Sequence, residues 1–279
     1  MASKQLLFGT GGTPLSAATR STISGIERIA ELGLDSMEIE FVQGVKMSEG
    51  TALKVKEAAC NAGVRLTAHG PYAINLNSSD PAKVHASKER ILKTATIGAL
   101  CGAESIVVHA AFYGESTSLQ VYQVVKESLT EITEHLRREN NRIWVRTELT
   151  GKATDFCTLE EVLQLGAEID GVAPCIDFAH WHARTGNYNS YDEFAAVLKR
   201  IEASLGRAGL DSMHTHVSGI LYTKHGERKH LPLRESDFRY EDLLRALRDY
   251  SAKGFVVCES PNLEEDAILL QRTFQSLGG

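Results

Sequence analysis

Histidines and carboxylates recur along the chain, each at the end of a short apolar run. They stand 29 to 43 residues apart. Imidazole nitrogens and carboxylate oxygens suit Zn²⁺ or Mn²⁺ as ligands. If the runs are neighbouring strands, six such groups meet in one pocket, where they would repel one another unless cations compensate. The sequence therefore predicts a metal site formed by His69, His109, Glu148, Asp177, His216 and Glu259.

Two kinds of chemistry fit these residues. Two metals that share a carboxylate, about 3.5–4 Å apart, can activate water and hold both oxygens of a phosphodiester displacement. Glu148 is the predicted catalytic bridge, because it stands between the two early histidines and the later ligands. One metal held by that carboxylate with Asp177, His216 and Glu259 would instead polarise adjacent sugar oxygens for isomerisation. The residue types leave both alternatives open.

The remaining histidines divide by position. His182 and His214 lie beside strand ends, where they could bind metal, support a ligand or serve the fold. His85 and His135 fall within predicted helices, and we expect them at the surface. His225 lies in a predicted loop after the seventh strand and has no assigned role.

Short β-rich runs alternate with longer segments whose apolar residues recur every three or four positions. The predicted strands are residues 5–9, 36–41, 65–69, 105–110, 142–148, 173–178, 212–217 and 255–259. The predicted helices are residues 22–32, 50–62, 81–101, 119–138, 158–165, 191–205, 240–250 and 264–277. Eight such units predict a parallel (β/α)₈ TIM barrel with its active site at the strands' C-terminal ends. The alternative, an open doubly wound sheet, lacks its GxGxxG motif after the first strand.

Composition narrows the class of protein. Of 279 residues, 43% are hydrophobic and 24% charged, and nothing divides them, so we expect a single domain over residues 1–279. A net charge of −6 argues against a general electrostatic attraction to nucleic acid. Five scattered cysteines without a CxxC pair argue against disulfides and thiolate zinc sites, and we expect them to be buried. Without a signal peptide or membrane span, we expect a cytoplasmic protein that does not contact membranes.

Six short motifs in order resemble those of endonuclease IV, the zinc-dependent apurinic/apyrimidinic endonuclease, in its archaeal form. They are AHGPYAINL (residues 68–76), VHAAFYG (108–114), TELTGK (147–152), CIDFAH (175–180), HVSG (216–219) and CESPN (258–262). The resemblance covers nearly the whole chain and places it among the xylose isomerase-like barrels. It implies a DNA-repair hydrolase that cuts the phosphodiester 5′ to abasic sites. The alternative from the same group of barrels is a metal-dependent sugar isomerase or epimerase, and a metal-binding barrel without catalysis is a third.

The resemblance also implies how the ligands are shared among zinc ions. His69, His109 and Glu148 would hold the first, and Glu148 with Asp177, His216 and Glu259 the second. The family's third zinc takes the histidine after CxDT, here His180, and the Asp and His of a DRH motif. This chain reads Glu227-Arg228-Lys229-His230 there, so Lys229 falls where a ligand histidine is expected. A protonated lysine is no ligand. We therefore expect two or three zinc ions, with Glu227 and His230 as candidate ligands of the third.

The family's partner is damaged double-stranded DNA, whose abasic nucleotide it flips out of a bent duplex. Unpaired, damaged positions cost least to extrude. Tyr72, Asn75 and Arg228 fall in matching motifs and are the predicted DNA contacts. We expect the protein to act as a monomer.

Overall fold

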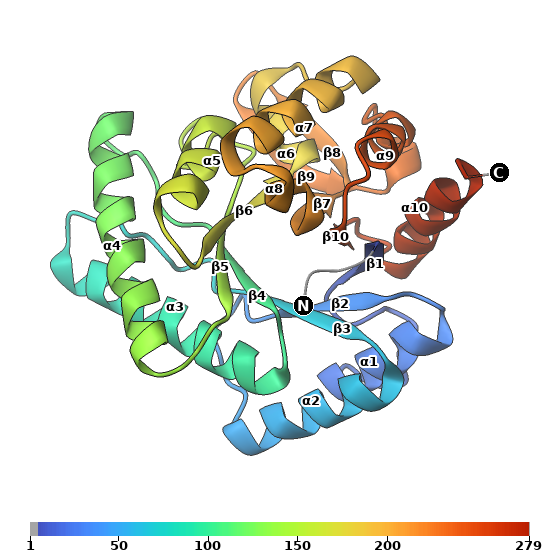
Figure 1. Ribbon diagram of the computed structural model, residues 1–279, viewed down its shortest axis with the longest axis horizontal. Helices are drawn as coiled ribbons and strands as arrows, with labels where there is room; N and C mark the ends of the chain where they lie inside the picture. The colour runs from blue at the N-terminus through green and yellow to red at the C-terminus, as the bar shows by residue number, and fades with distance from the viewer. Residues whose placement is uncertain (1–4, 279) are drawn as a thin grey trace.

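The computed structural model describes residues 5–278. Eight parallel strands close into a barrel in the order β1-β10-β7-β6-β5-β4-β3-β2, with the helices around it (Figure 1). This confirms the predicted (β/α)₈ fold. The barrel strands are β1 (Leu6–Gly11), β2 (Ser36–Glu40), β3 (Arg65–His69), β4 (Ser105–Val108), β5 (Trp144–Glu148), β6 (Val172–Asp177), β7 (Met213–Val217) and β10 (Gly254–Cys258).

Helices follow the strands where the three- and four-residue periodicity predicts them, with ends that differ by up to three residues. They are α1 (Thr22–Glu31), α2 (Glu49–Ala62), α3 (Pro81–Cys101), α4 (Ser118–Arg138), α5 (Leu159–Glu168), α7 (Tyr191–Leu205), α9 (Tyr240–Asp249) and α10 (Glu264–Ser276). Gly63 ends α2 in the left-handed region, at φ 68°, where glycine avoids the steric cost of a side chain.

Several elements were not predicted. Helix α6 (Phe178–Thr185) starts directly after β6, and the short α8 (Arg207–Asp211) and a 3₁₀ turn (Leu233–Glu235) lie further on. Between β7 and α9, where we expected a loop, β8 (Gly219–Thr223) and β9 (Gly226–Leu231) form an antiparallel hairpin. His225 lies in the turn between these two strands. The hairpin packs against α6, and this pair of elements carries part of the site.

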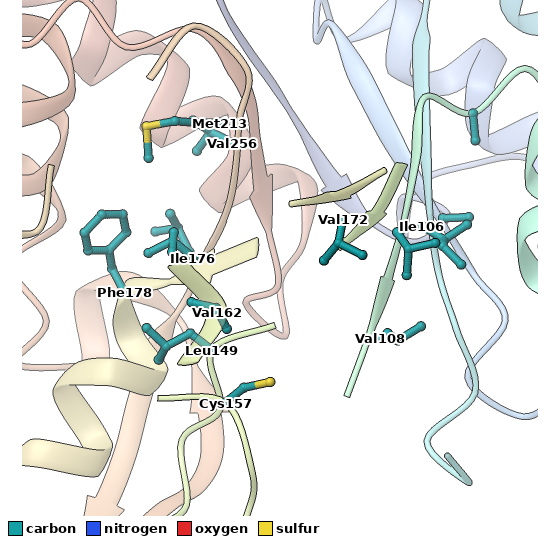
Figure 2. Close-up of a cluster of buried hydrophobic side chains, with 14 of the residues drawn as sticks. Ile106, Val108, Leu149, Cys157, Val162, Val172, Ile176, Phe178, Met213 and Val256 are labelled. Atoms are coloured by element: carbon teal, nitrogen blue, oxygen red, sulfur yellow. The ribbon is translucent and has the colours of Figure 1, made fainter. Parts of the chain in front are cut away.

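The apolar core lies between the barrel and its helices. Figure 2 shows part of it, where Ile176 of β6 and Phe178 lie near Val162 of α5. Alternation along a strand separates this layer from the barrel interior. In β7, Met213 belongs to the apolar core, whereas His214 and His216 contact carboxylates from other strands inside the barrel. The polar groups of the site are thus set on one face of each strand.

The cysteines are all free. Four are buried, as expected, but Cys60 on α2 is exposed, so the prediction was wrong there. Over residues 5–278, no helix combines the length and apolarity that crossing a bilayer requires.

Candidate metal centre

The C-terminal ends of the barrel strands meet at a pocket of about 600 Å³. Barrel register places the ligands side by side: Asp177 on β6 and His216 on β7 are directly paired. The predicted ligands that line the pocket are His69, His109, Glu148, His180, Glu227, His230 and Glu259. Parallel pairing thus gathers residues far apart in the sequence at one rim.

The first cluster contains His69, His109 and Glu148. One carboxylate oxygen, Glu148 Oε2, lies 3.1 Å from His69 Nε2 and 3.0 Å from His109 Nε2. His69 Nδ1 lies 2.8 Å from the carbonyl of Gly70 and can donate to it. That contact leaves Nε2 of the neutral ring as the ligand atom, the usual arrangement at metal-binding histidines.

The second cluster uses the other oxygen of the same carboxylate. Glu148 Oε1 lies 3.5 Å from His216 Nδ1, which is also 3.3 Å from Glu259 Oε1. Asp177 completes the group, whose ligand atoms all lie within 4.8 Å of one another. His216 Nδ1 and Asp177 Oδ2 are buried and have no hydrogen-bond partner among the described residues. Since unsatisfied buried polar atoms are rare, these two fit a site that a cation completes.

The third cluster lies on α6 and the hairpin rather than on barrel strands. Asp177 caps α6, because its Oδ1 accepts a 2.7 Å hydrogen bond from the backbone N–H of His180. His180 Nε2 then lies 3.1 Å from His230 Nε2 and 3.4 Å from Glu227 Oε2. His230 Nδ1 faces the carbonyl of Glu259 at 3.0 Å, which leaves Nε2 for the cluster.

A β-bulge explains how His230 comes to face Glu227. Leu221 pairs with Lys229, but Tyr222 pairs with Glu227, so Arg228 is the extra residue in β9. A single extra residue shifts the side-chain alternation by one. Without it Glu227 and Lys229 would share a face; with it Glu227 and His230 do, and Lys229 is exposed. Glu227 and His230 are separated by one residue more than the Asp and His of a DRH motif, and the bulge accommodates this extra residue.

Two glycines let the hairpin approach the barrel rim. Glu227 N donates to the carbonyl of Gly151 at 2.9 Å. A side chain at Gly226, whose φ is 92°, would place its Cβ 2.3 Å from that carbonyl oxygen. A Cβ at Gly151 would lie 2.8 Å from Glu227 Oε2. Glycine is needed at position 226 because the two backbones touch there, and at position 151 because the ligand side chain of Glu227 packs against it.

The electrostatics of the clusters follow from burial and charge pairing. Burial alone would raise the pKa of Glu148, but His109 and His216 hold it well below its usual range. Burial would lower the pKa of His69, but contact with Glu148 raises it to about 10. Burial raises the pKa of Asp177 to about 6, against the attraction of His180. A bound cation would replace the additional proton that His69 holds.

Sequence reasoning missed two carboxylates on β2. Burial raises the pKa of Glu40, which lines the pocket, to about 8. Its Oε1 is buried and has no hydrogen-bond partner among the described residues. Glu38 lies deeper in the barrel, within 3.0 Å of His214 and of His216. The signal was present: two carboxylates at alternate positions of a strand share one face, and register pairs Glu40 with His69.

The three predicted DNA contacts occupy different surroundings. Tyr72 lines the pocket with 61% of its surface exposed. Asn75 is turned toward its own loop and the loop after β4, where its side-chain oxygen accepts hydrogen bonds from the backbone of Asn77 and Phe112. Arg228, the bulge residue, is exposed on the hairpin and is not among the residues that line the pocket.

The remaining histidines differ in burial: two are exposed on helices and two are buried. His85 and His135 are exposed on their helices, as expected. His182 is buried, where Nδ1 faces the carbonyl of Asn187 at 2.8 Å and the ring stacks edge-on against Tyr222. His182 therefore supports the fold around α6. His214 lies inside the barrel, below the second cluster.

The arrangement offers ligand groups for two or three cations a short distance apart, since one carboxylate faces two clusters. Such a centre can bind an anionic oxygen and activate water. The second cluster by itself can hold a single divalent ion. These two capacities correspond to the two kinds of chemistry that the sequence leaves open.

The known proteins that are similar to this chain include both endonucleases and sugar epimerases. An uncharacterized protein of Methanocaldococcus jannaschii is 41% identical over 273 residues, which are 98% of each chain. A probable endonuclease 4 of Mesomycoplasma hyopneumoniae is 23% identical over 135 residues, 47% of each chain.

Solved structures show the same fold in proteins of both kinds. A D-tagatose 3-epimerase-like protein matches with a TM-score of 0.73 at 20% identity, over 97% of this chain and 96% of that one. Endonuclease IV from Thermus thermophilus matches with a TM-score of 0.71 at 20% identity, over 96% and 98% of the two chains. A family profile described as xylose isomerase-like TIM barrel matches residues 26–276. The chain belongs to the xylose isomerase-like TIM barrel family.

Proposed function

We propose that this protein is a zinc-dependent endonuclease that hydrolyses the phosphodiester 5′ to abasic sites in double-stranded DNA. The observation that carries the proposal is the position of Glu148, whose two oxygens face two separate ligand clusters. The third cluster, His180 with Glu227 and His230, adds to it. Isomerisation at one metal requires neither the pair His69 and His109 nor the third cluster.

The bound metals would supply Lewis acidity and lower the pKa of water, which is the main chemistry of such centres. The chain's own residues position them. Glu148 ties the first two clusters together, and Asp177 links its cluster to α6 through the helix cap. His180 reaches both neighbours: its Nδ1 lies 3.2 Å from Glu148 Oε1, while its Nε2 faces the third cluster.

The walls of the pocket suit an extruded nucleotide. Tyr72 and Phe112 expose 61% and 43% of their surfaces there and can stack on a sugar or base. Among the described lining residues, Lys152 is the only lysine or arginine. We place it near the phosphate that flanks the lesion. The pocket is otherwise acidic, so metal charge, rather than protein charge, would attract the phosphodiester.

The test is incision of an end-labelled duplex that carries one abasic-site analogue, with magnesium omitted and metal content measured on the same sample. We expect cleavage 5′ to the analogue by protein that holds two or three zinc ions per chain. An undamaged duplex of the same sequence is the control. Protein that holds this metal and leaves the lesion intact would contradict the proposal.

A sugar isomerase or epimerase is the second candidate, and two observations favour it. The cluster of Glu148, Asp177, His216 and Glu259 is complete without the others. Glu40 adds a further carboxylate to the pocket, which suits a hydroxyl-bearing substrate better than a phosphate. Conversion of ketoses by protein that holds one manganese ion, with no incision, would establish this function instead.

A further inference from the structure

Glu38 is a fully buried carboxylate in the barrel interior, below the metal clusters. It belongs to none of the groups that could hold a metal among the described residues. An ionised carboxylate in such a place requires compensating donors or charges. The role of Glu38 can therefore be inferred from the side chains that contact it.

Both oxygens of Glu38 face histidines of β7. Oε1 lies 3.0 Å from His216 Nε2, and Oε2 lies 3.0 Å from His214 Nε2. Thr67 Oγ1 donates a hydrogen bond of 2.7 Å to Oε2. Three side chains, one from the adjacent strand β3 and two from β7 across the barrel, thus converge on one carboxylate.

These contacts assign the protons of both rings. His216 directs Nδ1 to the second cluster, so a neutral ring carries its proton on Nε2, facing Glu38. His214 Nδ1 lies 3.2 Å from the hydroxyl of Ser105, which can donate to it. The proton of His214 then lies on Nε2, which also faces Glu38. The Nε2–H groups of both rings and the Thr67 hydroxyl thus face Glu38, and the lone pair of His216 Nδ1 remains for a metal.

His216 differs in this from His69 and His230. The carbonyls of Gly70 and Glu259 face the Nδ1 atoms of His69 and His230. At His216 the corresponding partner is a carboxylate. A carboxylate partner makes a ligating imidazole more basic and fixes its orientation.

We propose that Glu38 is a positioning residue for the second metal cluster. It holds the Nε2 proton of His216 and thereby directs Nδ1 toward Asp177 and Glu259. His214 and Thr67 keep Glu38 in place. The assignment concerns metal binding and does not depend on the reaction that the centre performs.

A different explanation is that the interior group itself binds an ion. Cys175, His214 and His216 offer ligand atoms within 4.8 Å of one another. The Nε2 contacts with Glu38 are also too bent to count as well-formed hydrogen bonds. However, His216 could serve that ion and the second cluster at once only as a ring stripped of both protons. We therefore assign Glu38 to positioning and let metal counting decide between the two.

The experiment compares Glu38→Gln with the wild-type protein. The amide keeps the size of the side chain but loses its charge. Zinc affinity is measured by competition with a chelator, and the cobalt-substituted protein reports ligand geometry through its visible spectrum. We expect one metal equivalent to bind about 10- to 100-fold more weakly, with a changed cobalt spectrum, while the other equivalents are unaffected. Cys175→Ala is the matched control in the same interior layer, and it should leave metal content and spectrum unchanged.

Two results would overturn the proposal. One is wild-type affinity and spectrum in a folded Glu38→Gln protein. The other is an additional tightly bound equivalent that disappears in both Glu38→Gln and Cys175→Ala, which would establish an interior metal site. Thermal unfolding of the metal-free variants checks that they fold. If Glu38→Gln does not fold, Thr67→Val removes one donor to Glu38 and should weaken the same equivalent by a smaller factor; an unchanged affinity there would contradict the proposal.

Discussion

The second and third clusters are built on different kinds of scaffold. In the second, Asp177 and His216 lie on paired barrel strands and are completely buried. In the third, Glu227 and His230 lie on a surface hairpin, where their side chains are 20% and 24% exposed. Strand register places the former, and one bulge places the latter. The ligands of the third cluster on the hairpin therefore depend on one local irregularity, whereas the buried ligands of the second are fixed by the barrel itself.

The largest effect is expected from the residue that joins the clusters. Glu148→Gln keeps the shape of the side chain but removes the charge that faces both His69 and His216. We expect loss of metal from the first and second clusters and a fall in activity of at least about 10³-fold, the scale seen when a central catalytic group is removed. Metal analysis and incision rates measure this, and circular dichroism checks the fold. Normal metal content with a normal rate would refute the bridging role.

The next prediction separates the third cluster from the second. His230→Ala should remove one metal equivalent, or weaken it by about 10- to 100-fold, and leave the other equivalents bound. Lys229→Ala is the matched control on the same strand, and Lys229→His should add no metal, because position 229 is exposed on the other face. Metal content after dialysis is the measurement. Equal losses in the two alanine variants would show that the bulge does not select His230.

A change of strand length tests the bulge itself. Deleting Lys229 leaves Glu-Arg-His, in which the glutamate and histidine are two residues apart and share a face of a regular strand. The deletion should therefore keep the third metal. Inserting one alanine after Lys229 should place His230 on the opposite face and abolish binding of the third metal. The reverse pattern of metal content would contradict the proposed register.

The smallest effect concerns pH. In the metal-free protein, contact with Glu148 raises the pKa of His69 to about 10, so its stabilisation is complete below pH 6.5 and is lost as pH rises through 10. Burial raises the pKa of Glu40 to about 8, so the stability of the metal-free protein also falls as pH rises from 4.5 to 8. Metal binding instead strengthens with pH, because its ligands must lose protons.

The difference in Tm between metal-loaded and metal-free protein should therefore grow from pH 6 to pH 9. For a chain of this size, each kcal/mol of unfolding free energy corresponds to a shift in Tm of about 2–4 °C. Calorimetry on both forms at three pH values measures it. A difference that shrinks with pH would mean that the metal does not bind at the protonated histidines.

Sequence patterns predicted the barrel and most of the candidate ligands, for a specific reason. A histidine or carboxylate at a strand end must reach the rim once the strands are parallel, as His69 and Glu148 do. Pattern reasoning missed β8 and β9, because both runs are short and lack a clear alternation, and β9 also carries three consecutive charged residues. It also missed Glu38 and Glu40, which strand pairing and closure of the barrel bring beside the histidines.

The sequence by itself determined which residue types stand at which strand ends, since the spacing of apolar runs sets the eight β/α units. Only the tertiary structure decided between Lys229 and His230, because a bulge is a property of strand pairing. The same holds for the environment of Glu38. Its contacts with His214 and His216 come from strands that closure of the barrel brings together across its interior. No local pattern encodes that distance.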